Sequence, residues 1–272
     1  MSVFQALVLG VVQGFTEFLP VSSSGHLVIV PQLFDWPAPT VGCDILVHLA
    51  TLVAVVAYFS RDIGRIIRAL VFPGRMSRQE IKYWRRIFIW LVIGSVPAEL
   101  AGVIFGGFFE NMFNQTLVVG IFFLLTSFLL VGADLALGRV NRQPAQLEKM
   151  RGIDAFVIGC FQALAIAPGL SRSGATIAGG VFLGLDRPAA ARFSFLLSIP
   201  AILGAFLFKL KDISGAFTGA SGTAYGLAAV AAGISGFVAV WFVMRYLKEH
   251  RLRVFAVYTL LLGVFVIFLS AV

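Results

Sequence analysis

The sequence predicts an all-α membrane protein with several spans, and three observations lead to that class. Hydrophobic residues make up 59% of the 272 residues and charged residues only 12%, about half the share in a typical soluble domain. Apolar stretches close to the length of a membrane span recur along the whole chain. A motif inside this apolar sequence occurs twice, 149 residues apart, and each copy interrupts a helical stretch.

Six full spans are expected, and the two motif segments remain outside them. Each motif segment, about 3–30 and 155–185, is long enough to enter the membrane as a helix, break and return. We therefore expect two re-entrant helical hairpins beside the six spans. The spans are predicted at 44–60, 87–108, 115–137, 193–208, 225–244 and 254–270.

The net charge of +8 comes from basic residues that are concentrated in a few segments of the chain. Of the 21 Lys and Arg residues, 18 fall in four short segments between apolar runs, the pattern that orients membrane proteins. Orientation explains this charge, and no nucleic acid partner is implied. If each motif segment is a re-entrant hairpin, all four basic segments lie in the cytoplasm. They also lie there if each motif segment instead crosses the membrane twice. The four segments are 61–86, 138–154, 186–192 and 245–253.

This order gives each half of the chain one hairpin followed by three spans. Three is odd, so the second half enters the membrane upside down relative to the first. Within a single membrane domain, 1–272, we expect inverted repeats at 1–137 and 155–272, joined by a cytoplasmic linker at 138–154. The hairpin tips would then meet near the middle of the membrane. Broken helices in corresponding halves mark the binding site of many inverted-repeat proteins.

Each motif copy combines a proline break with a serine-rich helix restart. The copies run over residues 13–25 and 162–174. Ser22 and Ser171 are placed to cap the restarting helices, and a helix N-terminus favours anions. Two such ends predict a receptor for phosphate or pyrophosphate. The amides expected to be free are those of Ser23, Ser24, Gly25, Arg172, Ser173 and Gly174.

The two copies differ at the positions that carry chemistry. Arg172 stands where the first copy has Ser23, whereas Glu17 and His26 correspond to Ile166 and Ala175. A guanidinium matches phosphate oxygens, and ionisable residues inside a membrane are functional candidates by default. A purely structural Glu17–Arg172 ion pair between the hairpins is the alternative, and it does not exclude catalysis.

Several neighbouring polar residues have structural alternatives as well. Gln13 lies one turn before Glu17 and either orients it or serves as a hydrogen-bonding strut. Ser22, Ser171 and Ser173 are explained equally well by capping. Outside the motifs, His48 lies one turn after Asp44 and is expected to pair with it near the outer interface.

The two motifs together resemble those of undecaprenyl-diphosphate phosphatases of the bacitracin-resistance type. The resemblance rests on the Gln13-to-Glu17 spacing followed by Pro20-Val-Ser-Ser-Ser-Gly-His26, and on Pro168-Gly-Leu-Ser-Arg-Ser-Gly-Ala-Thr176. It extends over essentially the whole chain in length, span pattern and motif order. It implies a bacterial inner-membrane hydrolase that converts undecaprenyl diphosphate to the monophosphate, recycles this carrier for peptidoglycan synthesis and confers bacitracin resistance. It also favours a site open to the extracytoplasmic side.

The resemblance also assigns roles to residues of this chain. It implies Glu17, Ser23, His26 and Arg172 as catalytic residues, with Ser23, His26 or a water molecule as the nucleophile. Members of the family depend on a divalent cation, Mg²⁺ or Ca²⁺, for which Glu17 is the candidate ligand. Many members have Glu where this chain has Gln13, so one anionic ligand is missing here. Motif and resemblance together give as substrate-binding residues Gln13, Ser22, Ser24, Gly25, Ser171, Ser173, Gly174 and Thr176.

A second class of function fits the same repeats. Secondary transporters and lipid flippases also use inverted repeats with broken helices. The predicted anion site combines a hydroxyl, a carboxylate, an imidazole and a guanidinium. Transport alone does not require all of these reactive groups, so an enzyme is favoured. The expected partners are a prenyl diphosphate lipid and the bilayer, and a homodimer is compatible with the sequence.

Overall fold

The computed structural model describes residues 1–139, 145–209 and 221–271, which form eleven α-helices and two short 3₁₀ helices. The α-helices are α1 (Val3–Phe18), α2 (Ser23–Leu33), α3 (Val41–Tyr58), α4 (Ser60–Val71), α5 (Arg78–Met112), α6 (Thr116–Arg139), α7 (Gly152–Leu164), α8 (Arg172–Phe182), α9 (Arg187–Lys209), α10 (Ser221–Glu249) and α11 (Arg253–Ala271). The 3₁₀ helices are η1 (Pro73–Arg75) and η2 (Leu147–Lys149).

Six of the described helices, namely α3, α5, α6, α9, α10 and α11, are long and apolar enough to cross a membrane. They coincide with the six predicted spans, so the all-α polytopic class is confirmed. The segment 61–86 was expected to be a loop, and this was wrong. It contains α4 and the start of α5, because isoleucines recur there at helical spacing among arginines and because Ser77 and Glu80 form a capping box.

The two motif segments form pairs of short helices with a break between them. With a rise of 1.5 Å per residue, α1 is about 24 Å long and α7 about 20 Å, whereas α2 and α8 are each roughly 17 Å. The apolar core of a bilayer is about 30 Å thick, so none of the four helices is long enough to span it. Both segments therefore contain the predicted helix, break and second helix, and the two helices of each pair contact each other.

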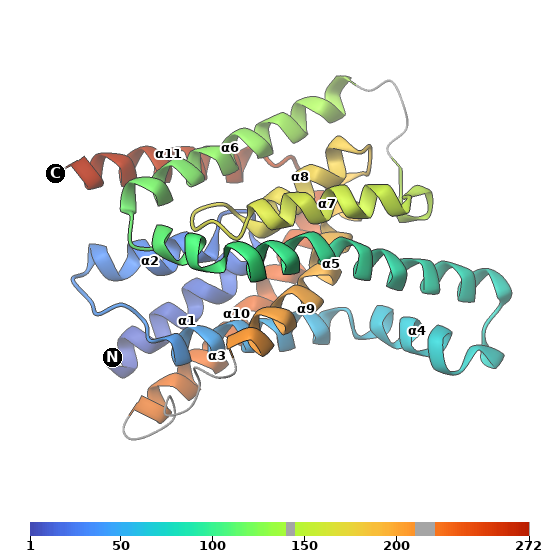
Figure 1. Ribbon diagram of the computed structural model, residues 1–272, viewed down its shortest axis with the longest axis horizontal. Helices are drawn as coiled ribbons and strands as arrows, with labels where there is room; N and C mark the ends of the chain where they lie inside the picture. The colour runs from blue at the N-terminus through green and yellow to red at the C-terminus, as the bar shows by residue number, and fades with distance from the viewer. Residues whose placement is uncertain (140–144, 210–220, 272) are drawn as a thin grey trace.

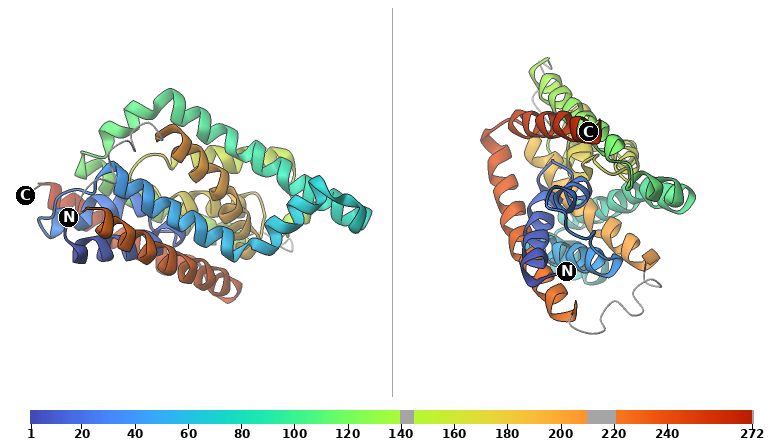
Figure 2. Two further views of the ribbon diagram at one scale, coloured as in Figure 1. Left: turned by 90° about the horizontal axis from the view of Figure 1, so that it is seen from below. Right: turned by 90° about the vertical axis from the view of Figure 1, so that its left-hand side faces the viewer.

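The first helix of each hairpin packs against a span from the other half of the chain. Helix α1 packs along α10, and α7 packs along α5. In the end-on view of Figure 2, α10 and α5 lie on opposite sides of the bundle. Gly10 of α1 faces the backbone of Ala228, and Gly159, 149 positions later, faces the backbone of Gly94. Small residues allow this close helix approach within membranes.

The helices run roughly along one axis, with both chain termini at the same end (Figure 1). The connection from α4 to α5 and the adjoining ends of α6 and α7 lie at the opposite end (Figures 1 and 2). The basic segment 61–86 and both flanks of the predicted linker therefore share one end, as expected from the charge pattern. Residues 140–144 of that linker lie outside the described residues.

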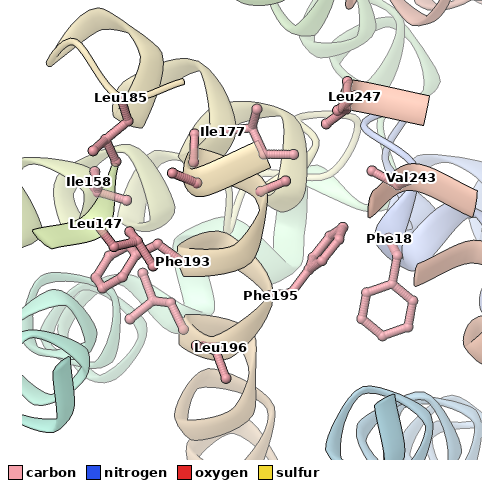
Figure 3. Packing of buried hydrophobic residues seen from close by; sticks show 14 of the residues in the cluster. Phe18, Leu147, Ile158, Ile177, Leu185, Phe193, Phe195, Leu196, Val243 and Leu247 are labelled. Carbon is pink, nitrogen blue, oxygen red and sulfur yellow. The ribbon is translucent and has the colours of Figure 1, made fainter. Parts of the chain in front are cut away.

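A buried aromatic contact holds the end of α1 against the central core. Phe18 is almost fully buried, and its ring meets the ring of Phe195 on α9 edge-on, with centroids 5.6 Å apart. Figure 3 shows Phe195 between Phe18 and the cluster around Phe193 and Ile177. Helix α9 contacts α3, α5 and α8, so Phe18 attaches the last turn of α1 to the central core.

Candidate active site

Serine caps begin the second helix of each hairpin, as predicted. Ser22 Oγ accepts from the amide of Gly25 at 3.3 Å, and Ser171 Oγ accepts from the amide of Gly174 at 3.0 Å. Gly25 and Gly174 were expected to offer free amides, and the caps instead take both of them. The amides left for a ligand in these first turns are those of Ser23 and Ser24 in α2, and of Arg172 and Ser173 in α8.

Each hairpin tip contains one residue with a positive φ angle. In the first tip this residue is Ser22, with φ of 69°, and in the second it is Gly169, with φ of 93°. Gly169 lies against the carbonyl of Val119 in α6, where a side chain would not fit. Thr126, also on α6, donates to the carbonyl of Gly169 and accepts from the amide of Ser171. The second tip is therefore fastened to α6.

The two tips contact each other directly. Ser173 Oγ donates to the carbonyl oxygen of Leu19 at 3.0 Å. Gly174 lies close to Pro20, and Gly25 lies close to the backbone of Gly169. The predicted meeting of the tips is thus observed, and Ser173 links them through the backbone.

Glu17 is the centre of the polar cluster between the tips. Its side chain is only 4% exposed. Oε2 accepts from Ser23 Oγ at 2.6 Å and from Gln13 Nε2 at 3.0 Å, while Oε1 pairs with the Arg172 guanidinium. Ser23 and Arg172, which occupy equivalent positions in the two motif copies, therefore bind the same carboxylate.

The two groups that cover Glu17 are more accessible than Glu17 itself. The Arg172 side chain is 22% exposed, and Ser23 is partly exposed. A ligand approaching the cluster would meet the Ser23 hydroxyl and the Arg172 guanidinium before the carboxylate beneath them. This order suits a site in which an anion binds above a buried base.

His26 lies in the same first turn of α2 as Ser23 but has other partners. Its Nδ1 is 2.7 Å from the carbonyl oxygen of Ser22, and its Nε2 is 2.7 Å from the hydroxyl of Tyr258 on α11. The ring of Phe123 meets the imidazole edge-on. The structure therefore brings Gln13, Glu17, Ser23 and Arg172 into one hydrogen-bonded cluster, whereas His26, three residues after Ser23, faces Tyr258.

The other predicted polar residues, Ser24, Ser173 and Thr176, make hydrogen bonds within the tips and to neighbouring helices. Ser24 Oγ contacts Ser22 Oγ, and Ser173 Oγ contacts Ser171 Oγ, both at 3.2 Å. Thr176 is buried; its hydroxyl donates to the carbonyl of Arg172 and lies 2.6 Å from Ser194 Oγ on α9. These contacts place Thr176 between α8 and α9, and the expected contact with substrate stays a prediction.

Three residues at the site were missed by the sequence reasoning: His48, Thr126 and Tyr258. His48 Nδ1 contacts Asp44 as predicted, but its Nε2 is 3.8 Å from Glu17 Oε2. The expectation of a pair near the outer interface was therefore incomplete. A histidine inside an apolar span was the available signal for His48. Thr126 and Tyr258 had no comparable signal, because both residue types are common in membrane helices.

The arrangement combines the parts needed for transfer of a phosphoryl group. A serine hydroxyl hydrogen-bonded to a buried carboxylate is the geometry of a nucleophile next to its base. Arg172 and the amides at two helix ends supply the positive charge that phosphate oxygens require.

A metal ion would have few protein ligands at this site. Among the described residues, no group of three or more His, Cys, Asp or Glu is placed to share a metal ion. One observation still favours a cation. Gln13 is fully buried and its Nε2 donates to Glu17, while its Oε1 has no hydrogen-bond partner among the described residues. One carboxylate and one amide oxygen suit Mg²⁺, which usually takes its other ligands from water and substrate phosphates.

Together, the fold and the site define a polytopic membrane protein with a Ser–Glu–Arg cluster at two helix breaks. The chain matches the family of bacitracin resistance protein BacA over residues 6–265, and it belongs to that family. Curated relatives named undecaprenyl-diphosphatase cover nearly its full length. The protein from Moorella thermoacetica is 40% identical over 98% of this chain and 97% of its own. The protein from Carboxydothermus hydrogenoformans is 41% identical over 100% and 98%.

Proposed function

We propose that this protein is an undecaprenyl-diphosphate phosphatase. It hydrolyses the lipid diphosphate to undecaprenyl phosphate and inorganic phosphate, recycles the carrier lipid for peptidoglycan synthesis and confers bacitracin resistance. One structural observation carries the chemistry: the Ser23 hydroxyl donates to Glu17, and Arg172 binds the same carboxylate. Membership of the BacA family and relatives named undecaprenyl-diphosphatase support the substrate.

In the first half of the reaction, Glu17 acts as the base for Ser23. Glu17 takes the proton from Oγ while Oγ attacks the terminal phosphorus, and the bond from phosphorus to the bridging oxygen breaks. Undecaprenyl phosphate leaves, and a phosphoserine forms at Ser23. The 2.6 Å hydrogen bond to Glu17 favours Ser23 over His26 as nucleophile, since His26 Nε2 faces Tyr258 instead.

In the second half, water attacks the phosphoserine. The bond from Ser23 Oγ to phosphorus breaks, and Glu17 returns its proton to Oγ. Because Glu17 is occupied in this way, another group must take the proton of the water. His26, one turn along α2, is the base that we assign to this step, and it then passes the proton to solvent.

Arg172 and the helix ends bind the phosphate groups. The guanidinium offers its donors to phosphate oxygens when the substrate displaces or shares its contact with Glu17. The free amides of Ser23 and Ser24 add donors from the N-terminus of α2. These groups stabilise the charge that shifts among the phosphate oxygens during transfer.

A divalent cation, Mg²⁺ or Ca²⁺, is part of the proposal. Glu17 and the unpartnered Oε1 of Gln13 would bind it, and the ion would neutralise negative charge on the diphosphate. Removal of divalent ions should abolish activity, and Gln13→Ala should raise the Mg²⁺ concentration for half-maximal activity. An unchanged Mg²⁺ requirement in Gln13→Ala would argue against this ligand set.

We further propose that the protein lies in the bacterial inner membrane as two inverted repeats, 1–137 and 155–272. The paired packing of α1 on α10 and of α7 on α5 supports this symmetry. The first hairpin would enter from the outside and the second from the cytoplasm, with the site open to the extracytoplasmic side. Labelling of single cysteines at Asp35 and Arg75 from each side of the membrane tests the orientation. A homodimer remains a separate prediction, which a mass measurement in lipid nanodiscs would test.

The decisive experiment is phosphate release from undecaprenyl diphosphate by the purified protein in detergent. No compartments exist in detergent, so a transporter or flippase without hydrolytic activity would release no phosphate. Glu17→Ala and Arg172→Ala should be nearly inactive. Glu110→Ala and Arg151→Ala are controls for loss of charge, since both residues are exposed. Near-normal activity of either site variant would overturn the assignment.

A further inference from the structure

The imidazole of His26 has its tautomer set by the backbone. Nδ1 is 2.7 Å from the carbonyl oxygen of Ser22. A backbone carbonyl can only accept a hydrogen bond, so Nδ1 carries the proton. In the neutral ring Nε2 then has a lone pair and acts as the acceptor.

Tyr258 is the partner of that lone pair. Its hydroxyl lies 2.7 Å from Nε2, and the planes of the two rings are parallel to within 4°. The distance is that of a hydrogen bond, with the tyrosine hydroxyl as donor. Phe123 contacts the imidazole edge-on, at an angle of 89°, so its orientation is fixed from a second direction.

Tyr258 also connects the site to the surface of the bundle. It lies on α11, in the second half of the chain, and its side chain is 45% exposed, whereas His26 is buried. The two ring nitrogens of His26 each have one hydrogen-bond partner. Ser22 belongs to the hairpin of α1 and α2, whereas Tyr258 lies outside it.

We propose that Tyr258 is a positioning residue that acts through His26. By donating to Nε2, it keeps this nitrogen unprotonated and fixes its direction before substrate binds. During the reaction the attacking water takes the place of the tyrosine hydroxyl at Nε2 and gives its proton to this nitrogen. This inference rests on the proposed function, in which His26 takes the proton of the water that hydrolyses the phosphoserine. Tyr258 itself need not touch the phosphate.

The kinetic test compares two tyrosine-to-phenylalanine variants. Tyr258→Phe removes only the hydroxyl, and Tyr225→Phe is the matched control, because the Tyr225 hydroxyl also makes one side-chain hydrogen bond, to Thr40. We expect Tyr258→Phe to lower kcat about tenfold with KM unchanged, as loss of one hydrogen bond in the transition state predicts. Tyr225→Phe should leave both constants within about twofold.

Two further measurements separate positioning from a general structural effect. In a His26→Gln background, Tyr258→Phe should lower kcat no further, because the residue through which it acts is gone. The protein has three histidines, so ring-nitrogen NMR of histidine-labelled protein can resolve His26, assigned by its loss in His26→Gln. The native protein should show Nδ1 protonated and Nε2 unprotonated but hydrogen-bonded. Tyr258→Phe should keep this tautomer, which Ser22 sets, and shift the Nε2 resonance toward that of a nitrogen without a hydrogen bond.

An unchanged Nε2 resonance in Tyr258→Phe overturns the proposal, as does an unchanged kcat or an additive effect with His26→Gln. The NMR measurement needs no substrate. A failure of the proposed phosphatase activity is therefore distinguishable from a failure of the proposed role of Tyr258.

Discussion

The hydroxyl of Ser23 donates to Glu17 Oε2 across 2.6 Å, which joins the first residue of α2 to the last turn of α1. Only the four residues of the break separate the two helices. A continuous helix would separate side chains six residues apart by about 120° around the axis and about 9 Å along it, because each residue advances by about 100° and 1.5 Å. The break at Pro20 therefore does more than expose helix ends, since it brings a hydroxyl onto a carboxylate.

Replacement of Ser23 should remove the nucleophile. We expect Ser23→Ala to lower kcat by about 10³-fold or more, as for other enzymes that form covalent intermediates. Phosphate release from undecaprenyl diphosphate measures this loss, and Ser270→Ala is the control because that serine is exposed near the C-terminus. Mass spectrometry of acid-quenched native protein should find phosphate on Ser23. Substantial activity in Ser23→Ala would instead indicate direct attack by water or by His26.

The Glu17–Arg172 pair should also contribute to stability. Arg172→Gln leaves a buried carboxylate without its cation, which costs about 3–5 kcal/mol for a fully buried pair and less here, because Arg172 is partly exposed. The midpoint of thermal unfolding in detergent should therefore fall. The double variant Glu17→Gln with Arg172→Gln should recover most of that loss while remaining inactive. If the double variant were as unstable as both losses combined, the two charges would not be coupled.

The sequence predicted the spans, the two broken segments and the residues that converge, because each of these depends on local pattern. Composition and span length locate α3 and α11, and a proline followed by serines locates the break at Ser22. Long-range partners have no such local signature. The contact of Tyr258 with His26 depends on how α11 packs, and the contact of His48 with Glu17 depends on the rotation of α3 about its axis. The contact of Thr176 with Ser194 on α9 likewise depends on packing that its place in the motif does not reveal.

His48 should tune Glu17 without being essential. Its Nε2 lies 3.8 Å from Glu17 Oε2, and its Nδ1 donates to the carbonyl of Asp44. His48→Leu removes this neighbour, and we expect a loss in kcat of about tenfold, equivalent to one polar contact. His48→Gln, which keeps a donor, should recover part of the activity. Phosphate release by both variants checks this, and equal activity of His48→Leu and native protein would show that the contact has no role in the reaction.

The positive φ angle of the second tip should be essential for placing Arg172. Gly169 and Gly184 have φ angles of 93° and 92°, but only Gly169 lies against a neighbouring backbone, that of Val119. An alanine with positive φ costs about 1–2 kcal/mol in backbone strain alone. Gly184→Ala should therefore lower stability by about this amount and leave activity intact. Gly169→Ala adds a clash with α6, so it should lower stability further and displace Ser171 and Arg172 from the cluster. Thermal unfolding and phosphate release for the two variants separate strain from displacement. Equal losses of stability, with activity retained in both, would mean that the second tip tolerates movement away from α6.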